Sequence, residues 1–268
     1  MTVGVLIFAF NNEQIDYLAM AAWSARNIHR HLNLPVCVVT DSETIPSNYE
    51  FDQVIKTQHR PPAIRNFTDI EGSVKWYNAN RIDAYELSPW DRTLVLDADY
   101  VVASNQLLTI TNTKQDFLCH RSAYDISGQQ PFTDTNTFGR FNMPMWWATV
   151  MMFNRSRSAD LIFKSMIMIH DNWQHYRNIY RTHKSTYRND HALTIALGMV
   201  NGHILEHDAI PWDLATLTAG PTLTQVSQDH YKIDYFTINK KHHWINIVGQ
   251  DFHAMGKTQL GAVVANSC

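Results

Sequence analysis

The stretch TLVLDADYVV, residues 93–102, decides the expected fold because it runs an apolar segment directly into two aspartates. Its mostly apolar start is typical of a buried strand. Asp97 and Asp99 follow at once, and two carboxylates at this spacing repel each other and lose hydration if the strand is interior. We therefore expect a positive charge between them. A hard cation such as Mg2+ or Mn2+, which prefers oxygen ligands, meets that need.

Strand-like and helix-like segments alternate through the first hundred residues around this stretch. Apolar runs at 3–10, 34–42 and 51–57 indicate buried strands, and apolar residues recur at helical spacing from 15 to about 30. A second helix is expected over 73–87. This alternation predicts an α/β fold with a mainly parallel central sheet flanked by helices.

The rest of the chain continues the pattern less regularly. We expect strands at 115–120 and 146–153, helices at 159–173 and from about 190 to 199, and a loop at 58–72. The last 65 residues show only short strand and turn signals.

Composition and charge narrow the class of protein. Of 268 residues, 45% are hydrophobic and 18% charged, which is typical of a globular protein and not of a disordered one. The net charge of -3 excludes a strongly basic nucleic-acid coat, though not a local basic groove. Three cysteines without a CxxC pair argue against a disulfide framework or zinc ribbon. No apolar run has the length of a signal peptide or membrane span, so we expect a soluble cytoplasmic protein with no membrane and no obligate protein partner.

Polar residues follow three of the expected strands. In parallel sheets ligands bind beyond the carboxyl ends of the strands, so these residues are expected to share one pocket. The first strand ends at Asn11 and Asn12, the second at Asp41, and the third at Asp97 and Asp99. An Asn-Asn pair is equally typical of an ordinary turn, and Asp41 has the same two interpretations.

Two chemistries use a pair of aspartates after an apolar strand, and a bare Asp-x-Asp motif also arises by chance. DADYV at 97–101 fits the motif of haloacid-dehalogenase-type phosphatases. That fold places the motif near the N-terminus and adds a later acidic pair after glycine, and neither feature is present. The other chemistry is glycosyl transfer from a nucleotide sugar, in which the cation bridges two phosphates and neutralises the leaving diphosphate.

The chain resembles GT-A glycosyltransferases, most closely the retaining family 8 enzymes related to glycogenin and bacterial galactosyltransferases. VLDADYVV (95–102) resembles the family's hydrophobic-DxD-hydrophobic element, and WWATVMMFNRS (146–156) its downstream strand. NDHALTIAL (189–197) is similar to the start of its Asp-Gln helix, and HAMGK (253–257) to its C-terminal His-x-x-Gly-x-x-Lys signature. All four motifs occur in the family's order.

The resemblance implies the architecture and the reaction. It implies a single GT-A, Rossmann-like domain over residues 1–268. Residues 1–102 are then the nucleotide-sugar-binding half, and residues 103–268 the acceptor-binding half with a C-terminal metal-ligand motif. The implied cofactors are Mn2+ or Mg2+ and a nucleotide-sugar donor, expected to be a UDP-sugar. The implied enzyme is a retaining hexosyl- or pentosyltransferase.

The resemblance also implies the metal ligands. Asp97 and Asp99, with Ala98 between them against the donor, would hold the cation, and His253 would be the third protein ligand. One histidine among fourteen is otherwise an ordinary surface residue. Lys257 would meet a phosphate, with Gly256 letting the backbone approach. Here glycine and lysine are adjacent, whereas the family separates them by two residues.

Three further groups of donor-binding residues follow from the resemblance. Family 8 enzymes carry a cation on the helix before the DxD strand, and the segment 72–85 offers Lys75 and Arg81, with Asn78 beside them. The sequence does not choose between the two cations, and a solvated helix face explains both equally. The base and ribose would be contacted by the residues at the first strand end, namely Phe10, Asn11 and Asn12, together with Asp41.

Asp190 would contact donor-sugar hydroxyls near the reacting carbon, so that it joins Lys75 and Arg81 as a candidate catalytic residue. The family has Gln directly after this aspartate, whereas this chain has His191. Asp190 also fits a helix N-terminal charge, with Asn189 as the N-cap.

The acceptor has to be inferred from surface chemistry. QHYRNIYRTHKSTYRND (174–190) interleaves cations with aromatics, and HRPPAIRNF (59–67) adds a second such stretch. This pattern suits a nucleic-acid backbone with stacked or flipped bases. An amphipathic helix with a solvent-exposed basic face explains it equally. The residues concerned in the first stretch are Tyr176, Arg177, Tyr180, Arg181, Lys184, Tyr187 and Arg188.

The chain is also similar to glycosyltransferases of T-even-like bacteriophages, which modify hydroxymethylated pyrimidines of their own DNA in the host cytoplasm. DNA is therefore the favoured acceptor. A saccharide or glycan acceptor is the alternative, with Trp146, Trp147 and Trp212 as stacking surfaces. The third alternative is a non-catalytic nucleotide-sugar binder.

Overall fold

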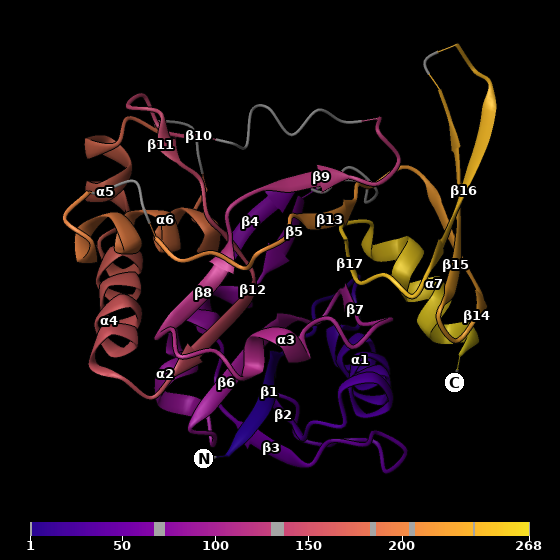
Figure 1. Cartoon of the computed structure of the whole chain (residues 1–268), viewed down its shortest axis with the longest axis horizontal. Coiled ribbons are helices and arrows are strands. Elements are labelled where there is room, and N and C mark those ends of the chain that lie inside the picture. Colours follow the sequence, from indigo (N-terminus) through magenta and orange to yellow (C-terminus); the bar gives the residue numbers. More distant parts are fainter. Residues whose placement is uncertain are drawn as a thin grey trace.

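The central element of the computed structural model is a six-stranded sheet (Figure 1). The structure describes residues 2–66, 73–129, 137–182, 186–203, 207–237 and 239–267. The strands of the central sheet are β1 (Val3–Phe8), β2 (Val36–Thr40), β3 (Gln53–Lys56), β6 (Arg92–Asp97), β8 (Phe117–His120) and β12 (Trp147–Asn154). Their order is β3-β2-β1-β6-β12-β8, with parallel pairing from β3 to β6 and antiparallel pairing of β12 with both neighbours. The predicted α/β fold with a mainly parallel sheet is confirmed.

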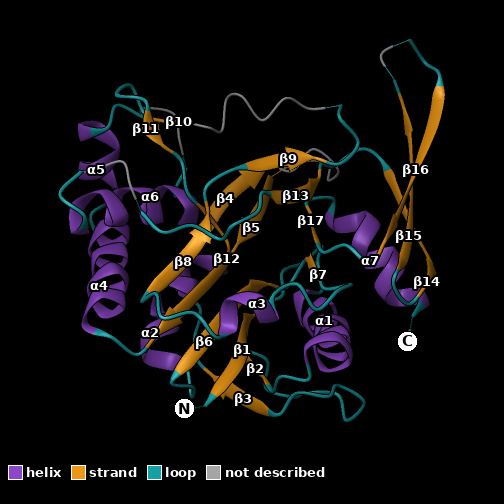
Figure 2. Ribbon diagram, in the orientation of Figure 1, coloured by secondary structure: helices purple, strands orange, loops and turns teal. Residues whose placement is uncertain are grey.

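The inner strands β1, β2, β6 and β12 are mostly apolar because both faces of the sheet are covered there, whereas the edge strand β3 is largely exposed. In β1, Val5 and Ile7 belong to one hydrophobic core, whereas Leu6 and Phe8 belong to the other. Helices α1 and α7 contribute to the first core, and α4 and α6 to the second, so that the sheet lies between two helical layers (Figure 2). The helices are α1 (Tyr17–Leu32), α2 (Ala84–Leu87), α3 (Leu108–Thr111), α4 (Arg157–Asp171), α5 (Trp173–Ile179), α6 (Asn189–Val200) and α7 (Lys257–Asn266), with the 3-10 helix η1 (Asn78–Asp83).

Two of the long helices begin at residues whose side chains accept hydrogen bonds from the free backbone N–H groups of the first turn, and α1 ends at a residue in the left-handed conformation. The carboxylate of Asp16 accepts a hydrogen bond from the backbone N–H of Ala19 at the start of α1, at 2.9 Å. Asn33 ends α1 in the left-handed region, with φ 51°. The hydroxyl of Ser156 caps α4 in the same way as Asp16 caps α1.

Smaller sheets surround the central one. The strands β7 (Tyr100–Val101), β17 (Phe252–Ala254), β13 (Leu214–Leu217) and β9 (Ala123–Asp125) form a four-stranded sheet in that order. A three-stranded antiparallel sheet contains β14 (Thr222–Ser227), β15 (His230–Phe236) and β16 (His242–Val248). Two-stranded pairs are formed by β4 (Ala63–Asn66) with β5 (Ser73–Trp76), and by β10 (Thr137–Phe138) with β11 (Met143–Pro144).

The predicted helix over 73–87 is wrong in its first half. Residues 73–76 form β5, in which buried Val74 and Trp76 alternate with exposed Ser73 and Lys75. Alternation of this kind is the pattern of a strand and not of a helix. Only after it does the chain become helical, as η1 and α2. The predicted loop at 58–72 likewise contains β4, the partner of β5.

None of the helices in the described ranges combines the length and the apolar character that crossing a bilayer requires.

We predict that Gly4→Ala destabilises the fold by about 1–3 kcal/mol, because overpacking a close contact forces backbone or ring movement. A Cβ on Gly4 would lie 2.3 Å from the Trp90 indole ring, which packs directly over β1. The matched control is Gly261→Ala inside α7, where a Cβ would meet Met20 at an ordinary 3.6 Å. Urea unfolding should show the control unchanged or stabilised by up to about 1 kcal/mol. Equal stability of the two variants would contradict the proposed packing.

Candidate active site

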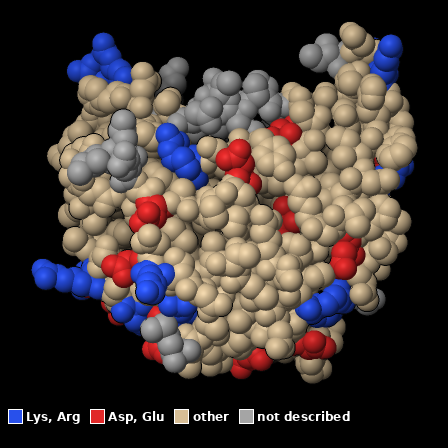
Figure 3. Space-filling view, viewed as in Figure 1, with Lys and Arg blue, Asp and Glu red and all other residues tan. Residues whose placement is uncertain are grey.

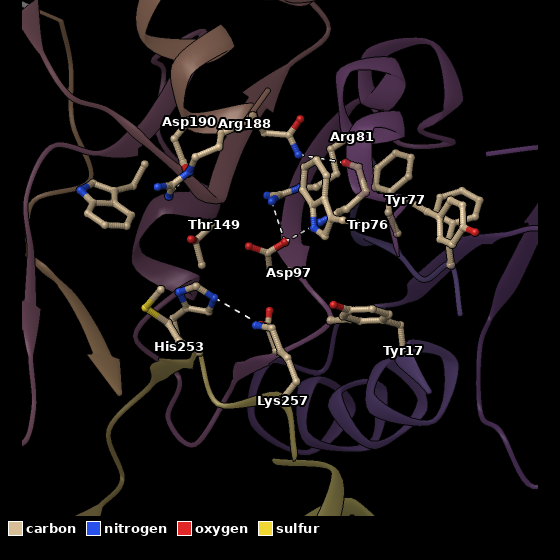
Figure 4. Close-up of a pocket in the computed structure, with 18 residues that line it drawn as sticks. Tyr17, Trp76, Tyr77, Arg81, Asp97, Thr149, Arg188, Asp190, His253 and Lys257 are labelled. Carbon is tan, nitrogen blue, oxygen red and sulfur yellow. Dashed lines mark hydrogen bonds and ion pairs between the residues drawn. The ribbon is translucent and has the colours of Figure 1, made fainter. Parts of the chain in front are cut away.

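One pocket lies where Asp97 ends β6, and it takes its walls from both ends of the chain (Figure 4). Its lining includes Phe8 and Phe10 from the first strand end, and His253, Met255 and Lys257 from the segment that leads into α7. This position at the carboxyl ends of β1 and β6 is where parallel sheets bind ligands.

Strand pairing brings His253 to the two aspartates. After Asp99 the chain enters β7, which pairs antiparallel with β17 so that Tyr100 lies opposite His253. The N–H of Ala254 donates to the carbonyl of Asp99 at 3.0 Å, continuing this pairing. As a result, His253 Nε2 lies 3.3 Å from Asp99 Oδ2.

Asp97, Asp99 and His253 fit a divalent cation. One ligand atom from each lies within 4.8 Å of the other two, and ligands on opposite sides of a Mg2+-sized ion are about 4 Å apart. Burial lowers the pKa of His253, although nearby Asp97 opposes this effect, so the ring is neutral at neutral pH. Neutral imidazole is the form that binds metals. Within the described residues, Nδ1 of the ring has no hydrogen-bond partner.

Buried Arg81 neutralises Asp97. Its Nη1 lies 2.6 Å from Asp97 Oδ1, and Asn78 Nδ2 donates to the same oxygen at 3.1 Å. The other guanidinium nitrogen donates to the carbonyl of Ala148 in β12. A buried guanidinium with a carboxylate partner is held in place, because breaking the pair would leave an uncompensated charge. Of the two candidate cations, Arg81 therefore reaches the site, whereas Lys75 is exposed on β5 and does not line the pocket.

Lys257 neutralises Asp99. Its ammonium forms an ion pair with Asp99 Oδ2 and lies 3.4 Å from the carbonyl of Ala254. Lys257 is the first residue of α7, and Gly256 is its N-cap with an ordinary φ of -74°. Within the described residues, no side-chain hydrogen bond caps this helix N-terminus. Gly256 itself does not line the pocket.

Asp190 enters the pocket from the start of α6. Its Oδ1 accepts from the N–H of Ala148 at 2.9 Å, and its Oδ2 pairs with Arg188 Nη2 at 2.7 Å. Burial alone would raise the pKa of Asp190, but the Arg188 guanidinium and the Ala148 N–H together bring it down to about 2. Asp190 is therefore a permanent carboxylate and not a proton donor at neutral pH.

The predicted N-cap role of Asn189 is wrong. The cap position belongs to Arg188, and it makes no side-chain cap hydrogen bond. The amide of Asn189 instead donates to the carbonyl of Asn78 at 2.9 Å, and its oxygen accepts from the Tyr187 hydroxyl at 3.2 Å. This side chain ties α6 to η1.

The expectation that all three strand ends share the pocket is wrong for Asn11, Asn12 and Asp41, which do not line it. Asn11 accepts from the N–H of Leu18 at 2.8 Å, and Asn12 accepts from the N–H groups of residues 14 and 15. Their side chains thus hold the connection between β1 and α1, which is the turn interpretation. Asp41 lies 3.9 Å from a His59 nitrogen. Phe10 and Ala98 do line the pocket.

Three aromatic side chains and one threonine hydroxyl line the pocket but were not predicted from the sequence. Tyr17, Trp76 and Tyr77 stand on one side of Asp97, and Thr149 stands on the other beside Arg188 and Asp190 (Figure 4). A lone threonine in the apolar run WWATVMMF was a usable signal, because a buried hydroxyl needs a polar partner. Tyr17 carried a weaker signal as the first residue of the helix after β1.

In the described part of the basic-aromatic stretch 174–190, two of the tyrosines are not exposed for stacking. Tyr180 and Tyr187 are buried in the core that includes α4 and α6, and the rings of His170 and Trp173 pack edge-on against Tyr187. Arg188 belongs to the pocket, and Lys184 lies outside the described residues. In the second stretch, Arg60 is paired with Asp83 at 2.6 Å, and Phe67 is outside the described residues.

The three tryptophans expected to stack on a glycan lie in different environments. Trp146 is buried in the core, where it packs edge-on against His207. Trp147 lines the pocket, and Trp212 lies outside it.

No family model and no curated protein matches the chain. Among solved structures it is similar to the glycosyltransferase GlyE of Streptococcus pneumoniae TIGR4 in its apo form, with 13% identity and a TM-score of 0.45 over 78% of this chain and 45% of that one. It is similar to the galactosyltransferase LgtC in complex with donor and acceptor sugar analogs, with 16% identity and a TM-score of 0.46 over 72% and 70%. The bifunctional glycosyltransferase WbbM shows 13% identity and a TM-score of 0.38 over 74% and 37%.

The chain thus spans less than half the length of GlyE and of WbbM. At such identities and TM-scores, these likenesses assign neither a family nor an activity to the chain.

We predict that Mn2+ binds at Asp97, Asp99 and His253, and that Asp99→Asn or His253→Ala weakens binding by at least about tenfold, since each removes a ligand. Electron paramagnetic resonance of free Mn2+ measures the affinity. Asp41→Asn, a carboxylate outside the pocket, is the matched control and should bind as the unmodified chain does. Binding that persists in both ligand variants would place the metal elsewhere.

We also predict that Asp190→Asn lowers the free energy of unfolding by about 2 kcal/mol at neutral pH, the equivalent of its pKa shift from 3.8 to about 2. Because the folded pKa is depressed, this stabilisation is complete above about pH 5 and is lost as the pH falls from about 4 towards 2. Urea unfolding of both proteins across this range should show the difference shrinking in acid. The control Asp160→Asn removes an exposed helix pair with Lys164 and should cost at most about 0.5 kcal/mol. A difference that grows in acid would contradict the assignment.

Proposed function

We propose that this chain is a metal-dependent glycosyltransferase with a single GT-A domain over residues 1–268, which moves a sugar from a nucleotide diphosphate sugar, a UDP-sugar, to a hydroxyl group. The observation that carries the proposal is the convergence of Asp97, Asp99 and His253 within 4.8 Å in a pocket that also holds buried cations.

The charges of the pocket favour a diphosphate. Among the described lining residues, the carboxylates of Asp97, Asp99 and Asp190 are balanced by three cations, which are Arg81, Arg188 and Lys257. A divalent cation adds two positive charges to this neutral set. A nucleotide diphosphate sugar supplies one negative charge on each of two phosphates, which restores neutrality. When bound, Mn2+ or Mg2+ neutralises charge on the departing diphosphate.

The other pocket residues are proposed to contact different parts of the donor, namely its phosphates and its base. Lys257, the first residue of α7, lines the pocket and is placed to meet the phosphates. The aromatic side chains of Tyr17, Trp76 and Tyr77 provide flat faces for the nucleotide base. Arg81 acts as a positioning residue, because it holds Asp97 through a direct ion pair.

Asp190 faces the sugar in this proposal. A carboxylate with a pKa of about 2 accepts hydrogen bonds from sugar hydroxyls but delivers no proton. In the transfer, the bond from the anomeric carbon to the diphosphate oxygen breaks, and its electron pair leaves with that oxygen. The acceptor oxygen bonds to the anomeric carbon, and its proton passes to the departing phosphate. The pocket supplies orientation, and the retaining outcome follows the resemblance to family 8.

The proposed acceptor is a hydroxymethylated pyrimidine base in bacteriophage DNA, in accordance with the resemblance to phage enzymes. A saccharide acceptor is the second candidate, because Trp147 lines the pocket and offers a stacking face. A non-catalytic nucleotide-sugar binder would use the same donor residues without transfer.

The test is mass spectrometry of hydroxymethylcytosine-containing DNA after incubation with the protein, Mn2+ and pooled nucleotide sugars. We expect a pentose or hexose mass on the base, and at least about a hundredfold less product with Asp99→Asn, which loses a metal ligand. Asp41→Asn should transfer normally. A parallel glycan panel identifies the second candidate acceptor. Donor binding without transfer or donor hydrolysis would show a binder, and phosphate release from phosphomonoesters would show a phosphatase.

A further inference from the structure

The antiparallel strands β15 and β16 project from the body of the molecule and expose large apolar side chains on one face (Figure 1). Cross-strand pairing places Phe236 beside His242 and Val248 beside His230 on this face, with Trp244 between these rungs. The exposed fractions are 69% for Phe236, 58% for Trp244 and 67% for Val248. We call this surface the outer hairpin face.

The opposite face already supplies the packing that the hairpin needs. Tyr231, Ile233 and Ile247 alternate with the outer residues and are buried in the core shared with α1 and α7. The fold therefore gains nothing from leaving an indole and a phenyl ring in water on the other side. Exposed apolar groups gathered on one face are typical of an interaction surface.

Cations surround these rings. Residues 230–248 contain three lysines, three histidines and one carboxylate, in a chain whose net charge is -3. That carboxylate, Asp234, is engaged by Lys232 at 2.9 Å and by His242 at 3.0 Å. Lys240 and Lys241 are exposed at the turn between the strands, and Figure 3 shows cationic atoms at this projecting end. With three lysines against one carboxylate, the hairpin is therefore net positive although the chain is acidic, and its excess positive charge lies at the turn next to the outer hairpin face.

We propose that the outer hairpin face binds single-stranded DNA, with Phe236 and Trp244 stacking on bases and Lys240 and Lys241 meeting phosphates. Flat rings bounded by cations are the recurring features of single-strand binding, since every base has a π-face and every nucleotide a negative charge. A neutral glycan would leave the lysines without a role. This inference rests on the proposed function, of which it names the surface that holds the DNA acceptor.

The hairpin is continuous with the metal site. His253 follows Val248 by five residues, so the base of β16 leads directly into β17 and the pocket. The seven residues of β16 span about 24 Å at the rise of a strand. A strand of DNA lying along the hairpin would thus direct one of its nucleotides towards the pocket.

The experiment measures fluorescence anisotropy of a labelled oligothymidine 20-mer with the full chain, in EDTA and without donor, so that binding is read separately from transfer. Phe236→Ala with Trp244→Ala should weaken binding by at least about tenfold. Lys240→Gln with Lys241→Gln should weaken it and lower the slope of log affinity against log salt by about 1.4, since each phosphate contact contributes about 0.7 for a single strand. Phe141→Ala removes an aromatic ring that is 60% exposed elsewhere and should bind as the unmodified chain does.

Hairpin variants that bind the oligonucleotide as tightly as the unmodified chain would overturn the proposal, as would no binding by the unmodified chain. Binding to anionic vesicles but not to DNA would assign the face to a membrane, and loss of a dimer in the variants would assign it to a second copy.

The hairpin variants should keep donor hydrolysis and lose only transfer to long DNA. If they still modify long DNA fully, the hairpin proposal fails and the proposed function stands; if the unmodified chain modifies only glycans, the DNA acceptor fails while the anisotropy result is unaffected.

Discussion

The site depends on one electrostatic constraint, namely that two carboxylates must lie close together at the end of a buried strand. In this structure Asp97 and Asp99 are compensated separately, the first by Arg81 and the second by Lys257. Each compensating cation is itself anchored in a different element, η1 in one case and α7 in the other. The like-charge repulsion at the end of β6 therefore determines where both of these elements have to lie.

The sheet could be predicted from sequence because its strands are apolar on both faces. In a run such as VGVLIF, alternate side chains enter the two cores on opposite faces of the sheet. A short, uninterrupted apolar run is therefore typical of an inner strand that is buried on both faces. The metal ligands were predicted differently. The pair Asp97 and Asp99 followed from its place after a strand, whereas His253 followed only from the resemblance, because β7 and β17 are too short for a periodic signal. The structure brings the three side chains within 4.8 Å of one another, and their roles as metal ligands stay predictions.

The predictions that failed did so where tertiary contacts decide between local alternatives. Asn11 and Asn12 suit a ligand or a turn equally, and only their bonds to the start of α1 select the turn. Lys75 and Arg81 are chemically alike, but a carboxylate at 2.6 Å selects Arg81. Tyr187 was predicted as a stacking residue, but it is buried, with His170 of α4 and Trp173 of α5 packed against its ring. The partners of Arg81 and Tyr187 come from other elements, and those of Asn11 and Asn12 lie a few residues further along the chain, so residue type alone does not reveal the contact.

The backbone of Ala148 has a consequence for how the site tolerates change. Its carbonyl accepts from Arg81 and its N–H donates to Asp190, so one residue of β12 links the two halves of the pocket without using its side chain. Substitutions at this position leave the link intact as long as they fit. A slip of the strand by one place, in contrast, would exchange the inward and outward faces and disconnect both partners together. The fully buried position of Ala148 therefore restricts its side chain only by size, whereas the spacing along β12 is fixed by both hydrogen bonds.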